Sequence, residues 1–463
     1  MASDIVVQKF GGTSVADEEI RRHAIRRVLE AAKAGLRPVV VVSAMGRYGA
    51  PYATDTLIDL ARKTDPDIQP RELDLIMACG EIISTVIMAT SIRATTGIDT
   101  IALTGGQAGI FTDYRFGGSR ILHIDPCCIV DCARQGKIPV VAGFQGVTEP
   151  EAGDAHGAIT TLGRGGSDTT ASAIGAAVGA RAVEVFTDVD GVMTADPRAV
   201  PTARTLRAVT YREVCEMAHL GAKVLHPRAA EIAMDYGIPL YVRSTESGAP
   251  GTLVTSEDSM GGTVSEVTGV TNTGPCAHVS LPVLNEMDRA HVALQVFRLL
   301  ATAGVPIYFV SGTETSVAFV VDKDRVRELK AVLNAVVVPV RRPGATLTRF
   351  YLISTGDGTP TFSAQKQILS EAGPDFATVV VPVTIGEDTR AVSLVGRGLQ
   401  TSVGVVWRMA DCLRKAGVRP LQTADSKLSL SCLVGEESVQ PAIRALHAEF
   451  IEKAWESEEA TDL

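Results

Sequence analysis

Short apolar runs rich in β-branched residues alternate with longer stretches of helical periodicity from the start of the chain to about residue 254. This alternation is typical of a parallel sheet whose crossover helices cover both faces. The apolar runs are continuous rather than alternating, which suits strands buried on both sides. We therefore expect an α/β fold. The expected strands are residues 5–10, 38–43, 100–103, 138–142, 182–187 and 238–243, and the expected helices are residues 17–34, 71–93, 168–180 and 211–236.

The second half of the chain has a different rhythm, which begins after a Gly/Pro-containing turn at residues 247–251 and a Gly-rich stretch at 260–262. A chain of 463 residues also exceeds the roughly 100–200 residues of one domain. We predict one domain over residues 1–255 and a second region over 256–463. That region reads as two copies of a small α+β unit, at about 265–340 and 390–455. We assign no pattern to residues 342–390.

The elements expected in the two copies follow a similar order. The expected strands are residues 267–270, 277–280, 307–310, 316–321, 391–395 and 428–434, and the expected helices are residues 289–302, 325–333, 405–416 and 439–450.

Charge and composition narrow the class of protein. The formal net charge of −9 and the pI near 5.5 argue against nucleic acid as a partner, because such binding needs Lys and Arg to neutralise phosphates. The N-terminus lacks the pattern of a signal peptide, and runs such as residues 38–42 are far shorter than the roughly 20 apolar residues that cross a bilayer. We expect a soluble cytoplasmic protein whose eight cysteines are reduced thiols, with no metal-ligand pattern.

The first expected strand delivers Lys9 into Gly11-Gly12-Thr13-Ser14, and a helix begins soon after. Two glycines let backbone amides approach an anion closely, and the helix N-terminus adds a partial positive charge. A phosphate site is one interpretation, and an ordinary strand-to-helix turn is the other. The spacing of a P-loop occurs nowhere in the chain, which disfavours that kind of nucleotide site.

A second glycine loop, residues 163–168, leads into a helix rich in small residues. Arg164 in this loop suits a substrate carboxylate, because a guanidinium group pairs with a carboxylate through two hydrogen bonds. Ser167 and Asp168 are also typical helix N-caps. Capping and a functional role are compatible here.

A third segment, residues 187–198, follows the most apolar strand and would lie outside the strand ends, where ligands bind in open α/β sheets. Its carboxylates do not match an EF-hand loop, because Gly at the sixth position and the closing Glu are missing. Glu81 lies within an otherwise apolar helix, and a surface carboxylate is the commoner explanation for such a residue.

Five motifs in order resemble the aspartokinases: Lys9 to Ser14, Val42 to Gly46, Gly163 to Asp168, Thr187 to Arg198, and Gly221-Ala222-Lys223. The resemblance implies an amino-acid-kinase fold, a three-layer αβα sandwich with a mostly parallel sheet, followed by two ACT-type regulatory modules. Residues 46–57 and Thr423-Ala424-Asp425-Ser426 look most like the diaminopimelate-responsive branch.

The resemblance also implies a role for each residue that matches a family motif. Lys9 and Asp168 would be catalytic, and Arg164 and Glu81 would bind the α-carboxylate and the ammonium group of aspartate. The implied ATP-binding residues are Lys9, Gly11, Gly12, Ser14, Thr187, Asp188, Met193, Arg198 and Lys223, and the implied substrate-binding residues are Ser43, Thr54, Glu81, Arg164, Gly165, Gly166 and Ser167.

The implied chemistry agrees with these residue types. The side chain of aspartate has a pKa of about 3.9, so this nucleophile is ionised at neutral pH and needs no general base. The difficulty is the approach of two anions, which requires Mg²⁺, a lysine and backbone amides around the γ-phosphate of ATP. We expect an amino-acid effector at the ACT-type region and a homo-oligomer. The alternatives are a kinase of the same fold that acts on another small acid, and a catalytically inactive amino-acid sensor.

Overall fold

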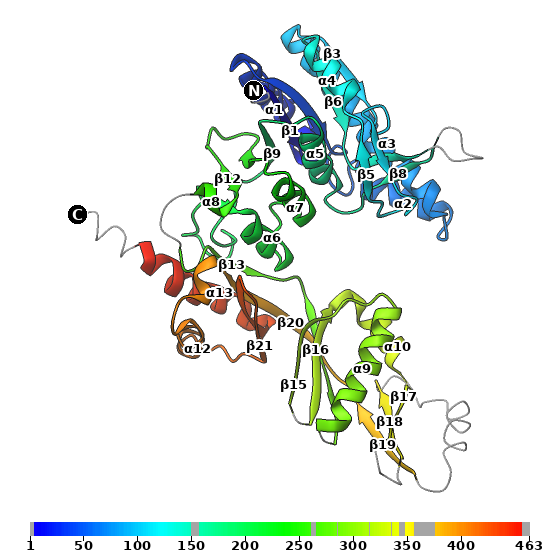
Figure 1. The fold of residues 1–463 in the computed structure, drawn as a ribbon, viewed down its shortest axis with the longest axis vertical. Helices are drawn as coiled ribbons and strands as arrows, with labels where there is room; N and C mark the ends of the chain where they lie inside the picture. Colours follow the sequence, from blue (N-terminus) through cyan, green and yellow to red (C-terminus); the bar gives the residue numbers. More distant parts are fainter. Residues whose placement is uncertain are drawn as a thin grey trace. The chain divides into compact units, whose positions relative to one another are not determined.

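The computed structural model describes residues 4–149, 157–260, 265–284, 286–313, 315–334, 336–341, 348–355 and 376–455. The chain forms two compact units (Figure 1). The first unit comprises Met1–Gly269 and Gly396–Gly398, and the second comprises Val270–Val395 and Leu399–Leu463. The division lies beyond the predicted boundary at residue 255, because the segment after that residue still contacts the first unit. For example, the hydroxyl group of Thr268 donates to Glu213 Oε1 at 2.5 Å.

The first unit is built on an eight-stranded sheet in the order β10-β12-β11-β9-β1-β2-β6-β3. Its strand pairs are parallel except for β11 with β12. The strands expected in this half are all present, with ends within two residues of those expected. Their bounds are β1 (Ile5–Phe10), β2 (Arg37–Val42), β3 (Thr100–Leu103), β6 (Ile138–Ala142), β9 (Ala182–Thr187), β10 (Ala208–Thr210), β11 (Leu240–Ser244) and β12 (Thr252–Thr255).

Helices cover both faces of this sheet. One core joins α1 and α3 to Phe10 of β1 and Phe186 of β9, whose rings stack 4.9 Å apart. On the opposite face, α5 packs so closely that a Cβ atom at Gly175 would lie 2.5 Å from Val183 Cγ2. The helices of the unit are α1 (Glu18–Lys33), α2 (Thr54–Thr64), α3 (Pro70–Thr96), α4 (Cys127–Arg134), α5 (Gly166–Ala177), α6 (Tyr211–His219), α7 (Pro227–Asp235), α8 (Glu257–Met260) and the 3₁₀-helix η1 (Gly12–Val15).

The prediction of one helix over residues 211–236 is wrong. The chain forms α6 and α7 with a turn between them, because Gly221 has φ +106° and Pro227 opens the second helix. The sequence patterns also missed a four-stranded sheet in the order β5-β4-β7-β8, whose strands are too short to show a period. Their bounds are β4 (Ile110–Thr112), β5 (Ile121–Ile124), β7 (Gln145–Thr148) and β8 (Ile159–Thr161).

Helix α3 is long and apolar enough to span a membrane by length and composition, with a mean hydropathy of 1.9 over its most apolar window. The expectation that every apolar stretch is too short is therefore wrong for this helix. Half of that window is buried inside the structure, where α3 packs against β3, β6 and β8. Core helices of soluble proteins pass the same test.

The second unit has a seven-stranded sheet in the order β15-β16-β14-β20-β22-β21, with β13 paired to β20. The neighbours along that order are antiparallel. Each predicted copy contributes strands to this sheet and helices to the unit, and the helices are α9, α10, α12 and α13. The elements are β13 (Gly269–Asn272), β14 (Cys276–Pro282), α9 (Glu286–Thr302), β15 (Tyr308–Thr313), β16 (Ser316–Asp322), α10 (Val326–Leu333), β20 (Thr384–Val395), α12 (Val405–Lys415), β21 (Gln422–Asp425), β22 (Ser429–Gly435) and α13 (Val439–His447).

The segment without an assigned pattern contributes to a separate three-stranded sheet in the order β17-β18-β19. Its strands are β17 (Val337–Arg341), β18 (Thr348–Ser354) and β19 (Phe376–Pro382). Residues 342–347 and 356–375 lie outside the described part of the chain.

Candidate active site

The carboxyl ends of three neighbouring strands bring the first predicted residues together. Strand β1 lies between β9 and β2, and Lys9 pairs in register with Val185 on one side and Val41 on the other. The loops that follow these strands therefore meet at one edge of the sheet. Lys9 Nζ lies 2.6 Å from Asp168 Oδ1, and both side chains are largely buried. The two predicted catalytic residues thus form an ion pair.

The glycine loop after β1 is closely packed. A Cβ atom at Gly12 would lie 2.5 Å from the carbonyl oxygen of Ala44, and one at Gly11 would lie 3.6 Å from Lys9 Nζ. Ser14 is buried, and its hydroxyl group lies 2.6 Å from that of Thr245. Its backbone N–H donates to the carbonyl oxygen of Gly11 at 2.9 Å. Ser14 therefore holds the loop in place, and Gly11 lies beside the ammonium group of Lys9.

Glu81 is 3% exposed, so the interpretation as a surface carboxylate is wrong. It lies on α3, and its Oε1 accepts the backbone N–H of Ala44 at 3.1 Å. Burial raises the pKa of this carboxyl group to about 8, although the Ala44 hydrogen bond opposes that shift. Its Oε2 is buried and has no hydrogen-bond partner among the described residues. A buried oxygen without a donor suits a ligand that brings its own cation.

The sequence patterns missed Asp74, which lies two turns before Glu81 on the same face of α3. Asp74 is fully buried. Its carboxylate accepts the backbone N–H of Gly117 at 2.9 Å, and the backbone N–H and hydroxyl group of Thr161 at 2.8 Å each. Burial raises the pKa of Asp74, and these hydrogen bonds oppose the shift. The signal in the sequence was a second carboxylate seven residues from Glu81 on an apolar helix.

Thr161 ends β8, and the second glycine loop follows directly. Gly165 is the N-cap of α5 with φ +68°, and a Cβ atom there would lie 2.1 Å from the ring of His226. Gly166 and Ser167 are buried at the start of α5, so their side-chain positions face the protein. The guanidinium group of Arg164 is exposed, and no described residue pairs with it. Arg164 is therefore available for a carboxylate ligand.

His226 was also not among the predicted site residues. Burial lowers its pKa, while the nearby Asp168 opposes that shift. The imidazole ring of His226 packs against the glycine loop at Gly165.

The remaining predicted residues follow β9 and α6. Asp188 accepts a hydrogen bond from the Thr187 hydroxyl group at 3.2 Å and pairs with Arg47 at 2.9 Å. Met193 is half-buried beside Thr205. Arg198 is exposed and pairs with Asp196 at 2.6 Å, which lowers the pKa of that aspartate. Lys223 is exposed in the turn between α6 and α7.

Two further predicted residues lie at the other side of β1. Ser43 directly follows β2, where its backbone N–H donates to the carbonyl oxygen of Phe10 at 3.1 Å. Thr54 is the first residue of α2. Across the described ranges of the chain, no group of three or more His, Cys, Asp or Glu side chains could hold a metal ion.

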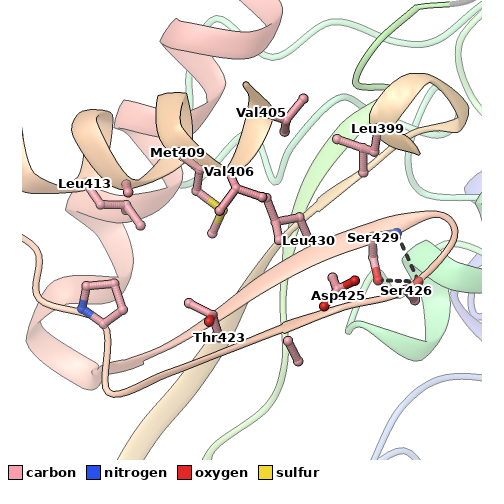
Figure 2. Close-up of a pocket in the computed structure, with 13 residues that line it drawn as sticks. Leu399, Val405, Val406, Met409, Leu413, Thr423, Asp425, Ser426, Ser429 and Leu430 are labelled. Atoms are coloured by element: carbon pink, nitrogen blue, oxygen red, sulfur yellow. Dashed lines mark hydrogen bonds between the residues drawn. The ribbon is translucent and has the colours of Figure 1, made fainter. Parts of the chain in front are cut away.

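The second unit contains a cavity of about 380 Å³ between α12 and the β21–β22 hairpin. Small-molecule sites range over roughly 300–1,000 Å³. Figure 2 shows Val405, Met409 and Leu413 of α12 on one side, and Thr423 and Asp425 of β21 on the other. The wall is therefore apolar on the helix and polar on the hairpin. This arrangement suits a small amphipathic ligand.

Comparison with known proteins places these features in a family. Residues 4–244 match the amino acid kinase family, and residues 392–450 match the ACT domain. The chain is 39% identical to aspartokinase 1 of Bacillus subtilis over 450 residues, which is 96% of this chain and 98% of that protein. It is 37% identical to an aspartokinase of Mycolicibacterium smegmatis, covering 96% of both chains. The structure of E. coli aspartokinase III in complex with aspartate and ADP has a TM-score of 0.68 and 25% identity, covering 96% of this chain and 99% of that one.

Proposed function

The chain belongs to the aspartokinases of the amino acid kinase family, and on that premise we propose which residues perform each part of the reaction. The enzyme transfers the γ-phosphoryl group of ATP to the side-chain carboxylate of L-aspartate and forms 4-phospho-L-aspartate. The strongest support for the assignment of residues is Glu81, a buried carboxylate with one oxygen that no described donor satisfies.

Glu81 and Arg164 orient the substrate. The ammonium group of aspartate occupies the space at Glu81 Oε2, where it satisfies the buried oxygen and makes the ionised form favourable. The α-carboxylate pairs with the guanidinium group of Arg164, which no described residue occupies. Asp74 supports this arrangement, because it ties β8 and the loop at Gly117 to the same helix that carries Glu81. The side-chain carboxylate then extends toward Lys9.

Lys9 stabilises the phosphoryl group during transfer, together with the amide of Gly12, while Gly11 allows the phosphates to approach Lys9 closely. A carboxylate oxygen of aspartate attacks the γ-phosphorus, and the bond to the oxygen that bridges the β- and γ-phosphates breaks. The electron pair of that bond leaves with ADP, and no proton has to move, because the nucleophile is already ionised. The carboxylate of Asp168 forms an ion pair with the ammonium group of Lys9 and fixes the position of that group at the end of β1.

The adenosine side of ATP lies toward the loop after β9 and the turn after α6. Met193, Arg198 and Lys223 are the residues assigned to it, and Lys223 is an exposed cation. Asp188 is assigned to the phosphate side of ATP. When bound with ATP, Mg²⁺ would neutralise part of the phosphate charge. The residues fit this ion, because Mg²⁺ is usually held by one or two carboxylates and the substrate phosphates, and Asp168 and Asp188 lie at this edge.

The cavity between α12 and the β21–β22 hairpin is the proposed site for an amino-acid effector. Asp425 offers a carboxylate for an ammonium group, and the α12 side chains offer apolar contact.

Exposed apolar side chains of the second unit, including Val403, Val406 and Trp407, support association of chains into a homo-oligomer. Light scattering of the purified protein measures that state. We assign the enzyme to the cytoplasm.

The experiment that tests the substrate assignment compares aspartate with succinate, which lacks only the α-amino group. Acyl phosphate is trapped with hydroxylamine in the presence of Mg²⁺ and ATP. The native enzyme should prefer aspartate by on the order of 10⁴, because a buried carboxylate is left unpaired by succinate. Glu81→Gln should reduce that preference to about 10² or less.

The matched control is Glu72→Gln, an exposed carboxylate on the same helix. It should leave the preference unchanged. If Glu81→Gln retained the full preference for aspartate, Glu81 would not be the ammonium site.

A further inference from the structure

An ion pair bridges the loops on either side of the phosphoryl site. Arg47 follows β2 and Asp188 follows β9, and their side chains lie 2.9 Å apart with exposures of 73% and 54%. Neither the reaction nor the fold described above gives Arg47 a role. An exposed ion pair of this kind contributes little to stability, so the position of the pair is more informative than its strength.

The sheet order places this ion pair over the end of β1. Strand β1 lies between β2 and β9, so a contact from the loop after β2 to the loop after β9 must cross the loop after β1. That loop contains Gly11 and Gly12. The loop after β2 contacts it directly, because the N–H of Gly46 donates to the carbonyl oxygen of Gly12 at 3.0 Å. The end of β9 contacts it too, because the N–H of Gly11 donates to the carbonyl oxygen of Phe186 at 3.4 Å.

The charges at this edge are paired. Lys9 is already bound to Asp168 at 2.6 Å, so the two form a neutral unit. A triphosphate and a dicarboxylic acid bring several negative charges to the same place. A further cation near the γ-phosphate would offset part of this charge, and the exposed guanidinium group of Arg47 lies across the loop. Guanidinium groups bind phosphate oxygens through two parallel hydrogen bonds.

We propose that Arg47 binds the terminal phosphoryl group of ATP, and that Asp188 holds its guanidinium group over the glycine loop until the nucleotide arrives. This inference rests on the proposed function, since it requires the phosphates to lie at Lys9. Arg47 leaves Asp188 when ATP binds, which also frees the Asp188 carboxylate. Because Arg47 contacts only the γ-phosphate, which ADP lacks, it strengthens the binding of ATP and not that of ADP.

The test measures nucleotide affinity by calorimetry with full-length protein, using ADP and the non-hydrolysable β,γ-imido analogue of ATP. Arg47→Gln should weaken binding of the ATP analogue by about tenfold or more and binding of ADP by less than about twofold. It should also lower kcat/KM for ATP by roughly 10- to 100-fold. Arg47→Lys should restore part of both losses, because it keeps the charge and loses the second hydrogen bond.

The control is Arg22→Gln, which removes another exposed arginine from an ion pair, with Glu18 on α1. It should change neither affinity. If Arg47→Gln weakened the binding of ADP and of the ATP analogue equally, or weakened neither, the assignment of Arg47 would be overturned. Lys9→Ala in the same assay separates the two proposals. If Lys9→Ala weakens the analogue and Arg47→Gln does not, only the role of Arg47 fails, and if neither weakens it, the phosphate site itself is misplaced.

Discussion

Single residues at the strand ends show how local environment changes the chemistry of a common side chain. Lys9 is held by Asp168, and Glu81 carries a raised pKa because it is buried. In water both groups would be charged and unexceptional. Inside the first unit Lys9 becomes a fixed cation, and Glu81 becomes a carboxyl group whose ionisation a cation bound beside it would favour.

Replacing Lys9 by Ala should lower kcat by about 10²–10³, the cost of removing one donor that stabilises charge in the transition state. The rate of acyl phosphate formation, trapped with hydroxylamine, measures this. Lys33→Ala, at the exposed end of α1, is the control and should retain normal turnover. Near-normal turnover of Lys9→Ala would remove Lys9 from its assigned role.

The pKa of about 8 at Glu81 predicts a pH dependence of kcat/KM for aspartate. The carboxyl group is protonated in the free enzyme below pH 8, and the ammonium group of aspartate needs the ionised form. The value of kcat/KM should therefore fall about tenfold for each pH unit below 8 and level off above it. Glu81→Gln should have a lower value without that slope. A slope that persists in Glu81→Gln would assign the titration to another group.

Elements, rather than single residues, determine how the loops of the site fit together. Helix α3 carries Asp74 and Glu81 on one face, so a single helix positions both the ammonium site and the strand that leads to Arg164. The loops after β1 and β2 touch so closely that only glycine fits at Gly12. Changes at these contacts should act on several loops at once.

Asp74→Asn tests the role of α3 as a common support. The amide group keeps one acceptor oxygen and turns the other into an NH₂ donor, so at least one of the hydrogen bonds from Gly117 and Thr161 is lost or reversed. The unfolding free energy should therefore fall by about 1–3 kcal/mol. The KM for aspartate should rise as β8 and Arg164 lose their fixed position. Denaturant unfolding and steady-state kinetics measure the two effects. Asp131→Asn on the surface of α4 should change neither, and an unchanged KM in Asp74→Asn would confine Asp74 to a role in stability.

Gly12→Ala tests the contact between the loops after β1 and β2. The added Cβ atom would lie 2.5 Å from a backbone oxygen, so one of the loops must shift. We expect turnover to fall by at least about tenfold, since displacement of a positioned group by 1 Å can cost 10². Gly248→Ala, where no atom lies within 4 Å of the new Cβ atom, is the control. Normal kinetics in Gly12→Ala would show that this packing is not required.

At the scale of the whole molecule, a kinase unit and a unit with an ACT domain share one chain. An effector changes activity only if it binds two conformations of the enzyme with different affinity. Titrations with lysine, threonine and diaminopimelate therefore identify the effector through the rate of acyl phosphate formation. Indifference to all three would argue against inhibition by these end-products.

Asp425→Asn should raise the half-inhibitory concentration of the active effector by about tenfold, which corresponds to about 1.4 kcal/mol, and leave uninhibited turnover unchanged. The control is Asp411→Asn on α12, outside the cavity. An unchanged half-inhibitory concentration in Asp425→Asn would place the effector elsewhere.

The sequence alone predicted the main strands and most helices of both units, because continuous apolar runs and glycine loops are local patterns. It missed the short strands β4, β5, β7 and β8 and the break between α6 and α7. It also indicated the family, and that resemblance predicted Lys9, Arg164 and Asp168 as members of one site, of which Lys9 and Asp168 are in contact. Only the tertiary structure decided the environment of each residue. It buried Glu81, joined Asp74 to Thr161, and laid Arg47 across the end of β1, because these contacts link segments that are distant in sequence. Strand order and burial depend on how the whole chain packs, and no local pattern records them.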